Sequence, residues 1–219
     1  LQRQAVDIAA QSILSHEAKK HRLTWILGDV WKKSSDWKFV LTKKIPLLTV
    51  ANDKTVENLT FFLANEDSRV IESLFKELMA IWSMKSHIID APFEQHFYVT
   101  KLIVSMAKFA PHNENLKQLL FNGVQHHIGS TNDKLQALGM ITAEKILGII
   151  DKDLRDEDKL KFEYSQFKPE IVNEIVEVIR KFPEEADFTD SLEKFNDDDG
   201  DEAITKLLSI ANREETQEI

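Results

Sequence analysis

The sequence lacks cysteine altogether and is poor in the residues that build tight turns. Its 219 residues include no cysteine, six glycines and five prolines. The missing cysteine excludes a disulfide framework, a thiolate zinc site and a cysteine nucleophile, and it suits a reducing compartment. So few turn residues disfavour a β-sandwich or β-barrel, and they make a glycine-rich phosphate loop hard to build.

Long hydrophobic runs are also missing. No apolar stretch reaches the roughly 18 residues that a membrane span needs, so we expect no membrane span. The chain begins with Leu1 and has no charged and then apolar signal region. We therefore interpret it as a fragment of something longer.

The net charge of −9 is unevenly distributed along the chain. Residues 1–110 carry 15 basic and 12 acidic side chains, whereas residues 111–219 carry 13 and 25. The acidity is densest in residues 184–202, where ten of nineteen residues are acidic. Such a segment repels itself and buries too little apolar surface to offset the entropy of ordering, so we expect a flexible linker there.

Helical periodicity dominates the rest of the sequence. Apolar residues recur at intervals of three and four in seven runs, which lie within 6–14, 23–31, 56–81, 97–109, 116–127, 135–149 and 171–182. Residues 129–133 separate two of the runs, and Thr131 to Asp133 offer cap oxygens to the second. Residues 37–50 are partly β-rich, but they have no evident partner strand, and we predict a loop or a short helix.

The predicted fold is therefore all-α. The helix pair 113–128 and 131–150 spans about 38 residues, close to the ~40–47 of HEAT-type repeats. This spacing favours an α-solenoid of HEAT-like repeats over residues 1–182. An acidic linker at 183–202 and a short helix and tail at 203–219 would follow.

Motifs for catalysis, metals or cofactors are not found. The adjacent His126 and His127 point about 100° apart on a helix and cannot easily share a metal, so we interpret the histidines as surface or partly buried residues. An EF-hand register through Gly200 would place Phe195 and Lys206 at its two ends, where carboxylates are required. Glu94 and Glu144 are interpreted as structural carboxylates. We expect no catalytic, metal or cofactor site.

One region combines aromatic and basic residues in a way that could hold nucleic acid. Stacking aromatics and phosphate-binding cations are typical of such sites. Because Trp31 continues an apolar helical face, core packing accounts for at least one of the tryptophans. The candidate contact residues for nucleic acid or another partner are Trp31, Lys32, Lys33, Trp37, Lys43 and Lys44.

Three groups of residues within 78–180 resemble the telomere-length-regulation protein family. The first contains Trp82 in 81–88 and Pro92, Glu94 and Gln95 in 91–96, followed by Val99-Thr100-Lys101. The second is Leu138-Gly139-Met140-Ile141-x-Ala143-Glu144. The third is 160–164, with Phe162 and Tyr164. The groups occur in the family's order over about half the chain, whereas residues 1–77 show no comparable match.

The resemblance implies a non-enzymatic HEAT-like solenoid that works in a hetero-oligomer. The family acts with two further helical-repeat subunits, captures phosphatidylinositol-3-kinase-related kinases and passes them to a heat-shock chaperone through an adaptor. It is found in cytoplasm and nucleus, and telomeric DNA binding is attributed to some members. The family's phosphorylated acidic linker contains serine, whereas the acids around Asp197 to Glu202 here contain none.

The motif residues also have a plain structural interpretation. Gly139 costs a helix about 1 kcal/mol relative to alanine, so a close helix crossing would explain it. Met140 fills irregular gaps, Pro92 suits a helix start, and Glu94 would lie near the positive end of the helix dipole. We expect these residues to hold a scaffold together. A scaffold is thus the leading hypothesis and a nucleic-acid-binding helical repeat the alternative, while an unrecognised hydrolase has no positive support.

Overall fold

The computed structural model describes residues 2–16, 20–109 and 114–182, apart from 152, 154 and 156. The chain divides into two compact units, Leu1–Glu184 and Glu185–Ile219. All the described residues belong to the first unit. The predictions of an acidic linker and a final short helix lie outside the described residues.

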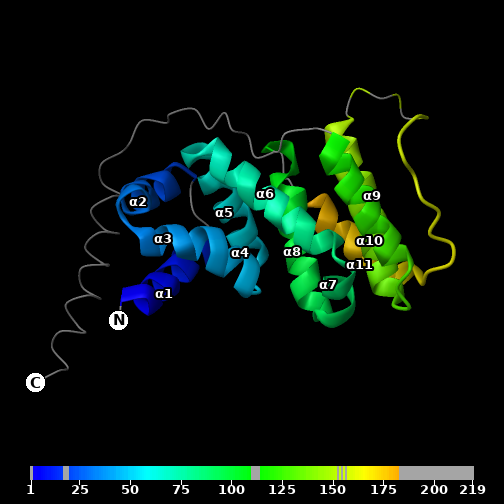
Figure 1. The fold of residues 1–219 in the computed structure, drawn as a ribbon, viewed down its shortest axis with the longest axis horizontal. Coiled ribbons are helices and arrows are strands. Elements are labelled where there is room, and N and C mark those ends of the chain that lie inside the picture. The colour runs from blue at the N-terminus through cyan, green and yellow to red at the C-terminus, as the bar shows by residue number, and fades with distance from the viewer. Residues whose placement is uncertain are drawn as a thin grey trace, which may run out of the picture. The chain divides into compact units, whose positions relative to one another are not determined.

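The described part of the chain is helical throughout and contains no strand, which confirms the all-α prediction. The seven predicted runs fall in helices, except that Phe182, the last residue of the seventh run, lies just beyond α11. The elements are α1 Gln2–Ser15, α2 Lys20–Lys33, α3 Ser35–Phe39, η1 Val40–Lys44, α4 Ile45–Leu48, α5 Asp53–Glu66, α6 Ser68–Ser83, α7 Lys85–Asp90, α8 Phe93–Met106, η2 Ala107–Phe109, α9 Glu114–Ile128, α10 Asp133–Ile150 and α11 Pro169–Arg180 (Figure 1).

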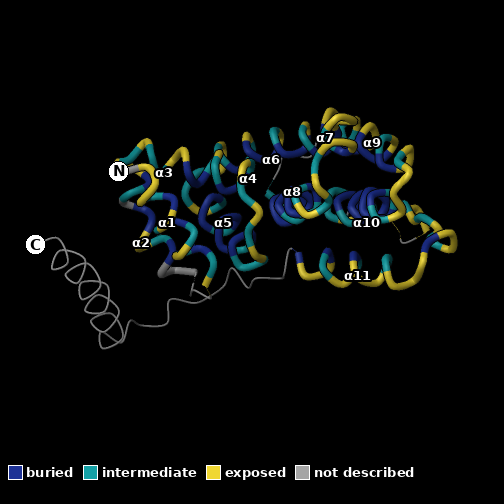
Figure 2. Tube along the Cα trace, turned by 90° about the horizontal axis from the view of Figure 1, so that it is seen from below, coloured by how far each residue is buried: buried dark blue, intermediate teal, exposed yellow. Residues whose placement is uncertain are grey.

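The helices of this unit form two rows (Figure 2). One row contains α6, α7 and α9, and the other contains α5, α8 and α10. Helix α6 packs on α5, α8 and α9, and α9 packs on α10, so each row covers the apolar face of the other. Helix α11 contacts α10 and adds a further helix beyond the second row. A helix in the middle of this arrangement, such as α8, is therefore covered on more than one side, by α5, α6 and α10.

The helices of the second row recur at a fixed interval along the sequence. Helices α5, α8 and α10 begin at Asp53, Phe93 and Asp133, which are 40 residues apart. Residues at this interval are buried in all three helices in five sets, which are Asn58, Tyr98 and Leu138; Leu59, Val99 and Gly139; Thr60, Thr100 and Met140; Phe62, Leu102 and Thr142; and Leu63, Ile103 and Ala143. The side chains within a set differ in size and polarity, so the three helices share a pattern of burial rather than of residue identity.

Residues 35–48 form a continuous helical segment, so the short-helix alternative for 37–50 is the correct one. Its middle, η1, is a π-helical turn just before Pro46. Proline lacks an N–H group and its ring clashes with the carbonyl four residues earlier, and a widened turn relieves this clash. Burial of Val40, Leu41 and Ile45, all fully shielded from solvent, outweighs the strand preference of the β-branched residues.

Asparagine side chains satisfy the orphan backbone groups at several helix ends. Asn58 on α5 donates to the carbonyls of Leu14 (2.8 Å) and His16 (2.9 Å), which closes the C-terminus of α1. Asn132 accepts from the Lys134 backbone N–H at 2.9 Å, as the cap prediction for α10 required. These bonds fix where α1 ends and where α10 begins.

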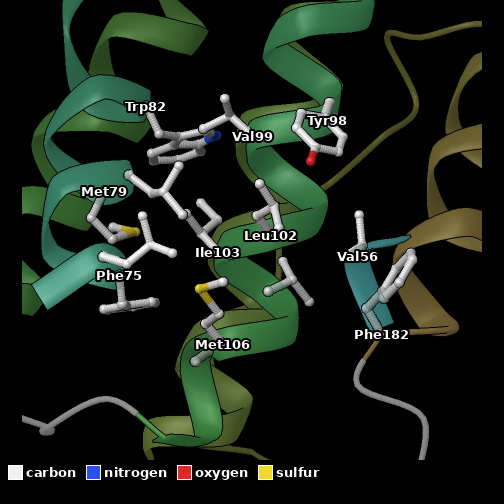
Figure 3. Packing of buried hydrophobic residues seen from close by; sticks show 14 of the residues in the cluster. Val56, Phe75, Met79, Trp82, Tyr98, Val99, Leu102, Ile103, Met106 and Phe182 are labelled. Carbon is white, nitrogen blue, oxygen red and sulfur yellow. The ribbon is translucent and has the colours of Figure 1, made fainter. Parts of the chain in front are cut away.

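The core lies between the two rows. Figure 3 shows Phe75, Met79 and Trp82 of α6 facing the side chains of α8, with Val99 and Ile103 among them. All five are at most 1% exposed. Each fully buried aromatic or aliphatic side chain of this kind contributes about 1.5–3 kcal/mol relative to exposure, so this contact anchors α6 to α8.

Candidate functional site

The tryptophans of the predicted nucleic-acid patch are turned toward the core. Trp31 is only 6% exposed and meets Phe62 edge-to-face, with ring centroids 5.8 Å apart. Trp37 is partly buried against the same core cluster. An indole held in the core cannot stack on a base, so Trp31 serves packing. The exposed tryptophan of α2 is Trp25, at 65%.

Three lysines of the same patch bind separate acids. Lys32 lies 3.8 Å from Glu66, Lys43 lies 2.5 Å from Glu77, and Lys44 lies 2.7 Å from Asp7, measured between nitrogen and oxygen. Lys33 ends α2 beside Lys32. These pairs tie α2, η1 and their neighbours together and neutralise the cations locally.

The Lys44 pair is the most enclosed of these contacts. Burial alone would raise the pKa of Asp7, but hydrogen bonds from Lys44 and Gln11 outweigh it and hold the pKa below its usual value. Asp7 therefore stays ionised at neutral pH and joins α1 to η1.

The first motif group forms a buried cluster between the two rows. Trp82 on α6 donates from its indole nitrogen to Thr100 Oγ1 on α8 at 3.1 Å, and its ring stacks on His127 of α9 with centroids 4.4 Å apart. His96 and His127 are both fully buried, and their Nε2 atoms lie 2.7 Å apart. Our interpretation of the histidines as surface or partly buried residues is therefore wrong for this pair.

The hydrogen bonds of the cluster determine the histidine tautomers. His127 Nδ1 lies 2.7 Å from the carbonyl of Gly123, which can only accept, so this nitrogen carries the proton. His127 Nε2 is then an acceptor for His96 Nε2–H. His96 Nδ1 is left buried without a hydrogen-bond partner among the described residues, and so is Nε2 of the neighbouring His87.

Both imidazoles are held neutral. Burial, reinforced by the nearby His127, lowers the pKa of His96 to about 2. Burial also lowers the pKa of His127 to about 4, although its bond to Gly123 acts in the opposite direction. Neutral imidazoles can pair by a hydrogen bond, whereas two buried cations would repel each other.

Two glycines make room for the cluster. A Cβ at Gly139 of α10 would lie 2.4 Å from the Cβ of His127, and one at Gly123 of α9 would lie 2.3 Å from the Trp82 ring. Both distances are far shorter than a carbon–carbon contact. The predicted close helix crossing at Gly139 is confirmed, and the residue that occupies it is His127.

The second and third motif groups meet at Glu144. The Glu144 carboxylate on α10 accepts a hydrogen bond from the backbone N–H of Phe162. Burial, together with this carboxylate, raises the pKa of the neighbouring Tyr164 hydroxyl, which makes no hydrogen bond of ordinary geometry. Glu144 thus secures the connection between α10 and α11. The predicted structural role of Glu144 therefore involves a backbone amide in the α10–α11 connection rather than a neighbouring helix.

The remaining motif residues lie at helix ends or in the core. Pro92 precedes α8 and Glu94 lies in its first turn, which agrees with their predicted places at a helix start. The Gln95 amide nitrogen is within 3.5 Å of the Leu47 carbonyl at the end of α4. Met140 is buried in α10 at 6% exposure. These positions stabilise contacts between helices.

The described part of the chain brings together no cluster with the composition of a metal site. No group of three or more histidine or carboxylate residues in this part of the chain could hold a metal ion. A hollow of about 240 Å³ between α1 and the start of α5 is lined by Gln11, Ser12, Ser15, Val50, Ala51, Asn52 and Thr55, none of which is an ionisable acid or base. None of the described helices could cross a membrane. In the part of the chain that the structure describes, these observations define an all-helical protein whose motif residues pack between helices.

Comparison with known proteins points to one distant relative. The mouse protein "Telomere length regulation protein TEL2 homolog" is 27% identical over 170 residues, which cover 73% of this chain and 20% of that protein. The matched segment thus corresponds to about a fifth of the relative. The name of the relative describes a regulator rather than an enzyme. No family model matches the chain, and no solved structure matches it.

The histidine pair is the feature that sequence reasoning missed. His96 and His127 lie 31 residues apart on different helices, so no local spacing joins them. A signal was nevertheless present, because each histidine lies three and seven residues from apolar residues that are buried on the same helix. These are Val124 and Leu120 for His127, and Val99 and Ile103 for His96. A histidine on an apolar stripe predicts a neutral side chain in the core.

Proposed function

We propose that this chain is part of a non-enzymatic scaffold within a helical-repeat cochaperone complex. The scaffold would recruit chaperone machinery to phosphatidylinositol-3-kinase-related kinases and would act in cytoplasm and nucleus. It would assemble with two further helical-repeat subunits. In this proposal the two-row helical unit is a segment of a HEAT-like solenoid.

The recurrence of α5, α8 and α10 every 40 residues is the observation that carries the proposal. Repeated helices that bury a common pattern of positions build extended surfaces for protein partners. The distant similarity to the mouse telomere length regulator supports the same role. The commitment of His96, His127 and Glu144 to packing supports it as well, because these are the groups from which a catalytic site would be built.

Coexpression tests the proposal directly. The full-length protein that contains this chain should copurify with both helical-repeat partners as one species during size-exclusion chromatography. Addition of a kinase of the stated class should give a larger complex. Failure of the full-length protein to copurify with either partner would contradict the proposal.

The alternative is a nucleic-acid-binding helical repeat that uses the residues from Trp31 to Lys44. The burial of Trp31 and the ion pairs of Lys32, Lys43 and Lys44 weigh against it. A titration with telomeric duplex DNA at several salt concentrations tests it. If Lys32, Lys33, Lys43 and Lys44 can all be changed to Glu without loss of measured DNA affinity, the alternative is wrong.

A further inference from the structure

Exposed aliphatic side chains gather where one row of helices passes into the other. The α4–α5, α7–α8 and α9–α10 connections lie along the same lower edge of the unit in Figure 1. Leu48, Val50, Ile89 and Ile128 fall three to five residues before α5, α8 or α10 begins. They are 72%, 52%, 67% and 46% exposed, respectively. We call these four residues the turn edge.

Side-chain contacts join α8 to the first turns of α5 and α10, next to the turn edge. Lys134 in the first turn of α10 lies over the Phe93 ring at the start of α8, 5.5 Å from its centroid. Lys101 of α8 bonds to Asp53 at the start of α5 at 2.6 Å. Because neighbouring helix axes lie about 8–10 Å apart, the three connections span about 20 Å. A partner helix of about 13 residues, rising 1.5 Å per residue, covers that length.

The charge beside the turn edge determines which partner fits it. Asp90, Glu94 and Asp133 are exposed and form no ion pair with any described residue. Glu94 and Asp133 also complement their helix dipoles, which explains two of the carboxylates but none of the exposed aliphatic groups. Two cations lie nearby: Lys85 is exposed, and Lys134, beside Asp133, pairs with Glu174 at 3.4 Å, so the carboxylates remain in excess. The excess of carboxylates repels nucleic acid, anionic lipid, a second copy of this edge and the acidic segment 184–202.

We propose that the turn edge docks a basic amphipathic helix of another protein. Aliphatic side chains on one face of that helix cover Leu48, Val50, Ile89 and Ile128, and its flanking Lys or Arg residues meet Asp90, Glu94 and Asp133. This inference rests on the proposed scaffold function and assigns part of its surface. The apolar contact supplies most of the affinity, and the carboxylates select a partner of positive charge.

Peptide binding by the 219-residue chain tests this inference. The probe is a fluorescein-labelled amphipathic helix of about 18 Leu and Lys residues, and the control peptide replaces every Lys with Glu. We expect saturable anisotropy with the Leu/Lys peptide only. The Ile89→Ser/Ile128→Ser double variant should weaken binding at least about tenfold, because it removes two apolar contacts.

Two matched control variants distinguish docking at the turn edge from nonspecific hydrophobic binding and from a general effect of net charge. Trp25→Ser/Ile26→Ser removes exposed apolar side chains from α2, 65% and 38% exposed, and should leave the affinity unchanged. Asp90→Asn/Asp133→Asn should weaken binding and reduce its salt dependence more than Asp153→Asn/Glu163→Gln, which removes the same charge elsewhere. Equal losses in matched pairs, equal binding of both peptides, or no saturable binding would overturn the inference. Copurification with the helical-repeat subunits tests the scaffold function independently of peptide binding. Failure of the turn edge to bind can therefore be distinguished from failure of the scaffold proposal.

Discussion

At the scale of single residues, Gly123 and Gly139 leave the space that the His–Trp cluster occupies. Gly148 lies on the same helix as Gly139 and provides a comparison. A Cβ at Gly148 would meet nothing within 4 Å, whereas one at Gly139 would meet His127. Helix propensity favours alanine at both positions by about 1 kcal/mol. The tertiary environment therefore determines opposite outcomes for the same change.

We expect Gly139→Ala to destabilise the protein and Gly148→Ala to stabilise it. Overpacking against the His127 Cβ should lower the free energy of unfolding by about 1–3 kcal/mol. Gly148→Ala should raise it by about 0.5–1 kcal/mol. Urea unfolding followed by circular dichroism measures both changes. Equal effects of the two substitutions would show that His127 does not limit the space at Gly139.

The buried histidine pair predicts a loss of stability in mild acid. The folded-state pKa values of His96 and His127, about 2 and about 4, lie below the unfolded value of 6.5. At pH values between the folded and unfolded pKa values, the two histidines are protonated in the unfolded chain but not in the folded chain. The pair's contribution is therefore fully present above pH 6.5 and is lost as the pH falls toward 4.

The expected loss approaches about 1.4 kcal/mol per pH unit for each histidine within that window. Urea unfolding at pH values from 7.5 to 5.5 measures it. Imidazole ¹⁵N NMR provides the control, because both rings should keep one protonated nitrogen each, Nδ1 in His127 and Nε2 in His96. Titration of either ring near its ordinary pKa in the folded protein would contradict the prediction.

At the scale of elements, Glu144 joins a helix to the connection that follows it. The backbone N–H of Phe162 is satisfied by this carboxylate, 18 residues earlier in the chain. Since Phe162 and Tyr164 pack against the core, loss of the bond would free this connection before α11.

We expect Glu144→Ala to lower the free energy of unfolding by about 1–3 kcal/mol, because a part-buried N–H loses its acceptor. Glu144→Gln, which keeps an acceptor oxygen, should lose less. Hydrogen exchange at the Phe162 amide should accelerate in the alanine variant. Glu163→Ala alters an exposed neighbour and should change neither quantity. Unaltered Phe162 exchange in Glu144→Ala would refute the role of this bond.

At the scale of the whole described unit, the two-row arrangement limits most helices to contacts with their near neighbours. Helix α1 contacts α3, η1 and α5, whereas α10 contacts α8, α9, η2 and α11. Stability in such an arrangement is approximately a sum of local and nearest-neighbour contributions. Damage at one end should therefore stay at that end.

Leu14→Ala tests this localisation. The fully buried Leu14 lies in α1, and its truncation should cost about 2–5 kcal/mol through the cavity it leaves. Native-state hydrogen exchange should show less protection in α1 and α5 and unchanged protection in α10. An Ala10→Gly variant, buried in the same helix, should follow the same pattern. A uniform fall in protection across α10 would indicate a single cooperative core.

The sequence by itself determined the helical class, the seven amphipathic runs, the Asn132 cap and the close crossing at Gly139. Each of these follows from periodicity, capping chemistry or backbone space within one helix or between adjacent ones. For residues 37–50 it left a loop and a short helix open, because the stretch is partly β-rich but has no evident partner strand.

Only the tertiary structure decided which polar residues meet. The His96–His127 pair, the tie from Glu144 to Phe162 and the pairing of Lys32, Lys43 and Lys44 with separate acids all join residues at least 18 positions apart. Local periodicity gives the face of a helix on which a side chain lies but not the helix that packs there. The partner, and with it the charge state and role of each group, is fixed when the two rows pack together.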